Sequence, residues 1–103
     1  MAHIDKRQVK DDLIVTLKSD DTVEKVIIFG SFLHASNPSD LDLAVFCNSS
    51  DDYLTLSLAL RKKLRGISSI IPIDLVPIAI PYDPSAAFMQ EINKGEVVYE
   101  KRH

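Results

Sequence analysis

Apolar residues recur at helical spacing in two stretches of the chain. In the first, Val9, Leu13 and Leu17 stand four residues apart among charged neighbours, which predicts an amphipathic opening helix that ends near Ser19. In the second, the apolar positions step by three or four residues through Tyr53, Leu56, Leu60, Leu64 and Ile67. This spacing predicts a second helix, which we expect Gly66 to end.

Four further runs have the composition or the alternation of strands. Residues 25–29 are largely β-branched or aromatic and stop at Gly30, which predicts a buried strand. Residues 40–46 alternate between a face with Leu41, Leu43 and Val45 and a face with Asp40, Asp42, Ala44 and Phe46. A third strand is predicted at 72–80, where Pro77 indicates an edge position or an early end of the strand. A short strand at 97–99 follows.

The last predicted helix lies between the third and fourth strands. Asp83 and Pro84 have the types preferred at an N-cap and a first helical position, and Gly95 suits the C-terminal cap. Phe88 and Ile92 stand four apart between them, and we expect Phe88 in the core. The order helix, strand, turn, strand, helix, strand, helix, strand predicts an α/β (α+β) fold. We expect a small mixed β-sheet covered by helices, in one domain that spans residues 1–103.

Composition narrows the functional classes. A chain of 103 residues with 46% hydrophobic content is long enough for one core. The net charge of -3 argues against binding of nucleic acid by bulk charge. No apolar stretch near the start of the sequence suits a signal peptide or a membrane span. Cys47 is the single cysteine and ends an apolar run, so we expect a buried thiol and a cytoplasmic protein.

Two aspartates share one face of the predicted strand at 40–46. Same-face residues two apart on a strand lie about 7 Å apart at their backbones, so the side chains of Asp40 and Asp42 are close enough to share Mg²⁺ ions. If the strand that carries Asp74 adjoins theirs, three carboxylates converge. Such a site suits two-metal nucleotidyl transfer, with Asp74 as the proton acceptor. For Asp40 and Asp42 the alternative is a polar strand end, and for Asp74 it is a turn cap.

Gly30 and Ser31 directly follow the predicted strand at 25–29. Glycine allows a tight bend there, and the hydroxyl and amide of Ser31 suit the oxygens of a phosphate. A triphosphate would then lie between this turn and the aspartates. The alternative is a plain strand-to-helix turn with an N-cap, which leaves the metal prediction intact.

The order of these motifs resembles the minimal nucleotidyltransferases (MNT) of the DNA polymerase β superfamily, and the likeness runs nearly end to end. The resemblance implies the palm-like nucleotidyltransferase fold. It maps Gly30 and Ser31 to the nucleotide-binding contacts, and Asp40, Asp42 and Asp74 to the catalytic, metal-binding carboxylates. The chain departs from the family in two places: residues 32–35 are Phe-Leu-His-Ala where arginine is usual, and the spacer at 32–39 is shorter.

Small members of this family act as antitoxins of an all-helical HEPN ribonuclease toxin, in some cases by transferring AMP from ATP to a toxin tyrosine. The resemblance therefore implies an enzyme with two Mg²⁺ ions, ATP as substrate and a hydroxyl on a HEPN-type partner as acceptor. A non-catalytic antitoxin or a nucleotide-binding regulator, acting by protein–protein binding alone, is the alternative. We expect no membrane and no direct nucleic-acid binding, and a homo-oligomer stays open.

Overall fold

The computed structural model describes residues 3–102, which form a mixed sheet with the strand order β3-β2-β1-β4. The elements are α1 (Lys6–Lys18), β1 (Val23–Phe29), the 3₁₀ helix η1 (Gly30–Leu33), β2 (Leu41–Cys47), α2 (Tyr53–Lys63), α3 (Arg65–Ser68), β3 (Ile73–Ala79), α4 (Ala87–Asn93) and β4 (Glu96–Glu100). Strand β1 pairs antiparallel with β2 and β4, and β2 pairs parallel with β3. The predicted mixed α/β fold is confirmed, and the strand with Pro77 lies at an edge.

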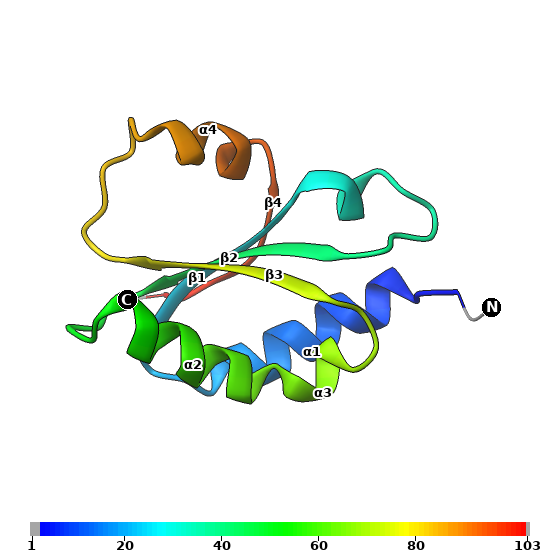
Figure 1. Ribbon diagram of the computed structural model, residues 1–103, viewed down its shortest axis with the longest axis horizontal. Coiled ribbons are helices and arrows are strands. Elements are labelled where there is room, and N and C mark those ends of the chain that lie inside the picture. Colours follow the sequence, from blue (N-terminus) through cyan, green and yellow to red (C-terminus); the bar gives the residue numbers. More distant parts are fainter. Residues whose placement is uncertain (1–2, 103) are drawn as a thin grey trace.

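Figure 1 shows α1, α2 and α3 together on one side of the sheet and α4 on the other. The larger core lies under the three helices, where the predicted stripe Val9, Leu13 and Leu17 is 3%, 0% and 0% exposed. The sheet contributes mainly these residues to that core: Val26, Ile28, Leu41, Leu43, Val45 and Leu75. The predicted alternation of β2 is therefore confirmed, since its apolar face packs on α1 to α3 and its aspartate face turns toward α4.

The helix on the second face begins later than the sequence predicts. Asp83 is not its N-cap: its carboxylate accepts hydrogen bonds from the amide (2.9 Å) and hydroxyl (2.7 Å) of Ser85, which closes a local turn instead. Because α4 starts at Ala87, Phe88 points outward and is 50% exposed, so its assignment to the core is wrong. Met89 and Ile92 are each 1% exposed and contact the sheet instead.

Gly66 does not end the second helix. It lies inside α3, because the backbone hydrogen bonds pass through Leu64, whose amide donates to Leu60 and whose carbonyl accepts from Ser68. A glycine in a helix costs about 1 kcal/mol, which the continuous burial of Leu60, Leu64 and Ile67 outweighs. Tyr53, at the start of the same predicted stripe, is 64% exposed and lies outside the core.

Gly95 follows α4, as the sequence predicts, and its amide donates to the carbonyl of Ile92 at 2.9 Å. Its backbone φ is not positive, so conformational freedom is not the reason for glycine here. A Cβ at this position would collide with the carbonyl oxygen of Ile28 and press on Ile27 and Phe29. Glycine thus lets the end of α4 approach β1 closely.

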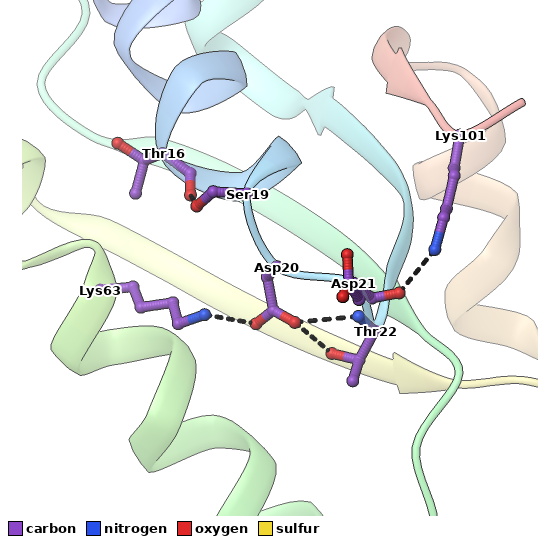
Figure 2. Close-up of polar contacts among 7 residues, drawn as sticks. All are labelled: Thr16, Ser19, Asp20, Asp21, Thr22, Lys63 and Lys101. Atoms are coloured by element: carbon purple, nitrogen blue, oxygen red, sulfur yellow. Dashed lines mark hydrogen bonds and ion pairs between the residues drawn. The ribbon is translucent and has the colours of Figure 1, made fainter.

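The loop between α1 and β1 is fastened by charged groups (Figure 2). The carboxylate of Asp20 accepts hydrogen bonds from the amide (2.9 Å) and hydroxyl (2.7 Å) of Thr22 and from Nζ of Lys63 on α2 (2.7 Å). Nζ of Lys101 donates to the carbonyl of Asp21 at 2.7 Å. The loop therefore joins α2 and the residues after β4 to the start of β1.

The composition predicted a buried Cys47 and no membrane span. The thiol of Cys47 is 0% exposed, and burial, followed by the charge of Asp20, raises its pKa to about 11. The prediction of a buried thiol is thus confirmed, and a raised pKa disfavours the reactive thiolate. Over residues 3–102, none of the helices has the length and apolar content needed to span a bilayer.

Candidate active site

The parallel pairing of β2 with β3 brings two aspartates side by side. In this register Asp42 is the direct partner of Asp74, and on its other side Asp42 is the partner of Phe29 in β1. Strand alternation places all three on the face of the sheet that α4 covers, at the end where β2 and β3 begin. The condition on which the sequence prediction depended, that the two aspartate strands adjoin, is therefore met.

Like charges gather around Asp42. Its pKa is raised, first by burial, then by the charge of Asp40, and then by hydrogen bonding with Asp74 and by the charge of that carboxylate. Asp40 is half-buried just before β2, and Asp74 is exposed on β3. An aspartate surrounded by two others is destabilised in its ionised form, and a divalent cation relieves this repulsion when it binds.

Gly30 lies against the carboxylate of Asp42. Its φ of +77° falls in the left-handed region, and it is the only described residue with a positive φ. A Cβ at position 30 would also overlap the side chain of Asp42. Glycine is thus needed twice here, for the bend after β1 and for the close approach of the turn to the carboxylate. The turn and the aspartates consequently form one site.

Ser31 begins the turn of η1 and lies at its exposed side. Its hydroxyl donates to Oδ1 of Asp40 at 3.5 Å, a long contact that links the turn to the carboxylates. Its carbonyl accepts hydrogen bonds from the amides of His34 (3.1 Å) and Ala35 (2.9 Å). Phe32, the next residue, is 0% exposed and anchors the turn in the larger core. The structure thus brings together the five residues that the sequence singled out.

The three aspartates meet part of what a divalent cation requires of its ligands. Within residues 3–102, no three side chains of His, Cys, Asp or Glu are gathered around one point as a closed metal site. The ligand type nevertheless fits a hard cation, since all three side chains are carboxylates and two are paired in register. Burial raises the pKa of Asp42 most, and the charges of Asp40 and Asp74 raise it further. A divalent cation would offset this second effect. The residues therefore fit Mg²⁺ by chemistry, with a pair in contact and the third carboxylate close by.

Sequence reasoning missed one residue that contacts the site. Lys6 of α1 donates from Nζ to the carbonyls of Leu33 (3.3 Å) and Ala35 (3.0 Å), so a cation from another element holds the end of η1. In the sequence, Lys6 is one of several charged residues in the opening helix. No local pattern links it to a turn more than twenty residues away, and only the packing of α1 beside η1 reveals the contact.

Comparison with solved structures finds chains of toxin–antitoxin complexes with this fold. One belongs to a tri-AMPylated Shewanella oneidensis HEPN toxin in complex with an MNT antitoxin (TM-score 0.64, 18% identity, 93% of this chain and 73% of that one). Another belongs to the toxin–antitoxin MntA-HepT (TM-score 0.57, 17% identity, 92% and 73%), and a third to a toxin–antitoxin structure with AMP-PNP (TM-score 0.60, 18%, 90% and 74%). At this identity the likeness establishes the fold.

No protein of curated function matches the sequence significantly. The family model described as polymerase beta, nucleotidyltransferase matches residues 11–103, which include the glycine–serine turn and all three aspartates of the site. The match covers nearly the whole sequence, and it agrees with the mixed sheet and with the register that pairs Asp42 with Asp74. The chain therefore belongs to the polymerase β nucleotidyltransferase family.

Proposed function

We propose that this protein is a Mg²⁺-dependent nucleotidyltransferase that transfers AMP from ATP to a hydroxyl on a HEPN-type partner protein, for which it serves as antitoxin. The observation that carries the proposal is the pairing of Asp42 with Asp74 in register, with the charge of Asp40 acting on Asp42 and the Gly30 turn lying against its carboxylate. Membership of the nucleotidyltransferase family supports the type of reaction. The structural neighbours, one with an AMPylated HEPN toxin and one with AMP-PNP, support the partner and the nucleotide.

Asp40, Asp42 and Asp74 would hold the Mg²⁺ ions. Bound there, Mg²⁺ would neutralise charge on the phosphates and align the attacking and leaving oxygens. The carboxylates have the freedom to turn toward a cation, since each side chain rotates about two bonds from a fixed backbone. The Gly30 turn, with no side chain at its closest point, leaves room for phosphate beside Asp42, and Ser31 offers its hydroxyl as a donor.

In the reaction, the hydroxyl oxygen of the acceptor attacks the α-phosphorus of ATP. A new P–O bond forms, the bond from the α-phosphorus to the bridging oxygen breaks, and pyrophosphate leaves with the electron pair of that bond. Asp74 accepts the hydroxyl proton. It suits this role because it is exposed at the strand edge, where an acceptor can reach it, whereas Asp42 is more enclosed.

Transfer can be measured with ATP labelled at the α-phosphate, Mg²⁺ and, as acceptor, the protein encoded by the gene next to that of this chain, which the proposal expects to be of HEPN type. We expect label on the partner with the wild type and with Asp11→Asn, an exposed change on α1 that serves as the control. We expect none with Asp42→Asn. The proposal is wrong if the wild type transfers no label, or if Asp42→Asn transfers as much as the control.

A second candidate function is neutralisation of the partner by binding alone. The specific observation in its favour is that η1 contains no arginine, so the turn has no cationic side chain of its own for phosphate. A variant with Asp40, Asp42 and Asp74 all changed to Asn separates the two. Equal neutralisation of the partner by this variant, at equal dose, would favour binding alone, whereas loss of neutralisation with the complex intact would favour transfer.

A further inference from the structure

Lys6, in the first turn of α1, contacts η1 through three neighbouring residues. Its ammonium donates to the carbonyls of Leu33 (3.3 Å) and Ala35 (3.0 Å) and lies 5.4 Å from the centroid of the Phe32 ring. These distances fit hydrogen bonds to a charged donor and a cation–π contact. The side chain is partly buried against the turn, so its position is defined on several sides.

The contacts of Lys6 complete a network that fixes Ser31. The carbonyl of Ser31 accepts from the amide of Ala35, and the carbonyl of that same alanine accepts from Lys6. Phe32 anchors the turn to the larger core, because its ring is fully buried there. The amide of Ile4 adds a second tie from the start of the chain, since it donates to Oδ1 of Asn37 at 2.9 Å.

The charge of Lys6 matters as well as its hydrogen bonds. The carbonyls of Leu33, at the end of η1, and of Ala35, just after it, carry partial negative charge. No residue of η1 is cationic, and the nearby ammonium of Lys6 offsets these dipoles. A neutral residue at position 6 would leave the turn both looser and more negative.

We infer that Lys6 is a positioning residue of the nucleotide site, which holds the Gly30–Leu33 turn in the geometry that receives the phosphates of Mg²⁺–ATP. The inference rests on the proposed function and extends it to a residue outside the sequence motifs. Lys6 acts through the turn, because its two hydrogen-bond acceptors are backbone carbonyls of the turn and the residues next to it.

The test is a calorimetric titration with Mg²⁺ and AMP-PNP of the wild type, Lys6→Met, Lys6→Arg and Lys10→Met. Methionine keeps most of the stem over Phe32 but removes the donors and the charge. Lys10, one turn further along α1, pairs with Glu96 at 3.0 Å and serves as the matched control. We expect Lys6→Met to bind about fivefold more weakly, which corresponds to about 1 kcal/mol. Lys6→Arg, which can still donate to both carbonyls, and Lys10→Met should bind within about twofold of the wild type.

Urea unfolding of each variant verifies that the folded state is populated in the titration, so that a loss of affinity reports on the turn. If Lys6→Met does not fold, Lys6→Leu replaces it, since leucine also has neither donor nor charge. Wild-type affinity in the neutral variant overturns the inference, as does an equal loss in Lys10→Met. Absence of binding by the wild type is a different outcome, since it refutes the proposed function itself.

Discussion

Two partly buried aspartates, Asp20 and Asp42, have opposite surroundings. Asp20, in the loop before β1, accepts hydrogen bonds from Lys63 and Thr22 (Figure 2). Burial alone would raise its pKa, but these hydrogen bonds and the charge of Lys63 outweigh burial and lower the pKa. The pKa of Asp42, in β2, is raised by burial and then by two neighbouring carboxylates, those of Asp40 and Asp74.

The difference separates a carboxylate that stabilises the fold from one that costs stability. A lowered pKa means that the folded state favours the ionised form, and a raised pKa means that it disfavours that form. The fold supplies a lysine to Asp20, which ties α2 to the loop before β1. It supplies further aspartates to Asp42 and places the Gly30 turn beside it. A carboxylate whose charge is destabilised by burial and by specific neighbouring charges has the electrostatic pattern of a binding or catalytic site.

The largest expected effect separates activity from stability at the two sites. Asp42→Asn should lower AMP transfer by about 10²–10³-fold, because a metal contributes several kcal/mol to the transition state and each 1.4 kcal/mol is tenfold. The same variant should have an unchanged or higher free energy of unfolding in urea, since it removes a disfavoured charge. Asp20→Asn should leave AMP transfer unchanged and lower the free energy of unfolding, since it removes a favoured charge. A clear loss of stability in Asp42→Asn would show that this carboxylate serves the fold.

The next largest effect concerns the Gly30 turn, which lies against Asp42 and has no counterpart beside Asp20. Gly30→Ala should lower the free energy of unfolding by about 2 kcal/mol, because alanine is strained at a φ of +77° and its methyl group overlaps Asp42. Nucleotide binding should weaken with it. Gly66→Ala is the matched control: nothing lies within 4 Å of the added methyl in α3, so stability should be equal or slightly higher. Equal losses in both variants would contradict the packing of Gly30 on Asp42.

A smaller effect on stability is expected when the Lys63 partner of Asp20 is removed. Lys63→Met should lower the free energy of unfolding by about 1 kcal/mol, because the hydrogen bond joins two charged groups but Lys63 is 41% exposed and screened by water. Lys62→Met, at an exposed position of the same helix, is the control and should change stability little. AMP transfer should stay at the wild-type level in both. Indistinguishable unfolding curves for the two variants would show that the Asp20 pair contributes nothing measurable.

The smallest effect is the pH dependence of that pair. The folded pKa of Asp20 is lowered from 3.8, so the stability that it contributes is complete above that value and is lost as the pH falls through the lower folded pKa. Between pH 7 and about pH 3, the wild type should therefore lose more stability than Asp20→Asn. Urea unfolding at both pH values measures the difference. Parallel losses in the two proteins would show that Asp20 is not the group responsible.

The elements that the sequence predicted well are those whose pattern is set by burial on one face. The stripe of α1 and the alternation of β2 follow directly from packing on the sheet. The sequence also indicated which residues form the candidate site, because Gly30, Ser31, Asp40 and Asp42 lie close in sequence and Asp74 is the only charge in its strand.

The features that sequence reasoning did not find depend on contacts between distant segments. Asp83 and Pro84 have the composition of a helix start, yet the side chain of Asp83 closes a turn with Ser85, and α4 begins three residues after Pro84. In the sequence, Lys6 does not differ from its charged neighbours in α1. Only the fold places it beside the end of η1. Such contacts have no periodicity, so a single sequence contains no signal for them.

We propose that the three aspartates and the Gly30 turn bind magnesium and nucleotide together. The most direct test of this joint binding is the free energy of unfolding with and without Mg²⁺ and AMP-PNP, for the wild type and Asp42→Asn. We expect a hundredfold excess of ligand over its dissociation constant to raise the stability of the wild type by about 2.7 kcal/mol. The variant should gain little, although it folds. An equal gain in both proteins, or none in the wild type, would show that the aspartates and the turn do not form the binding site.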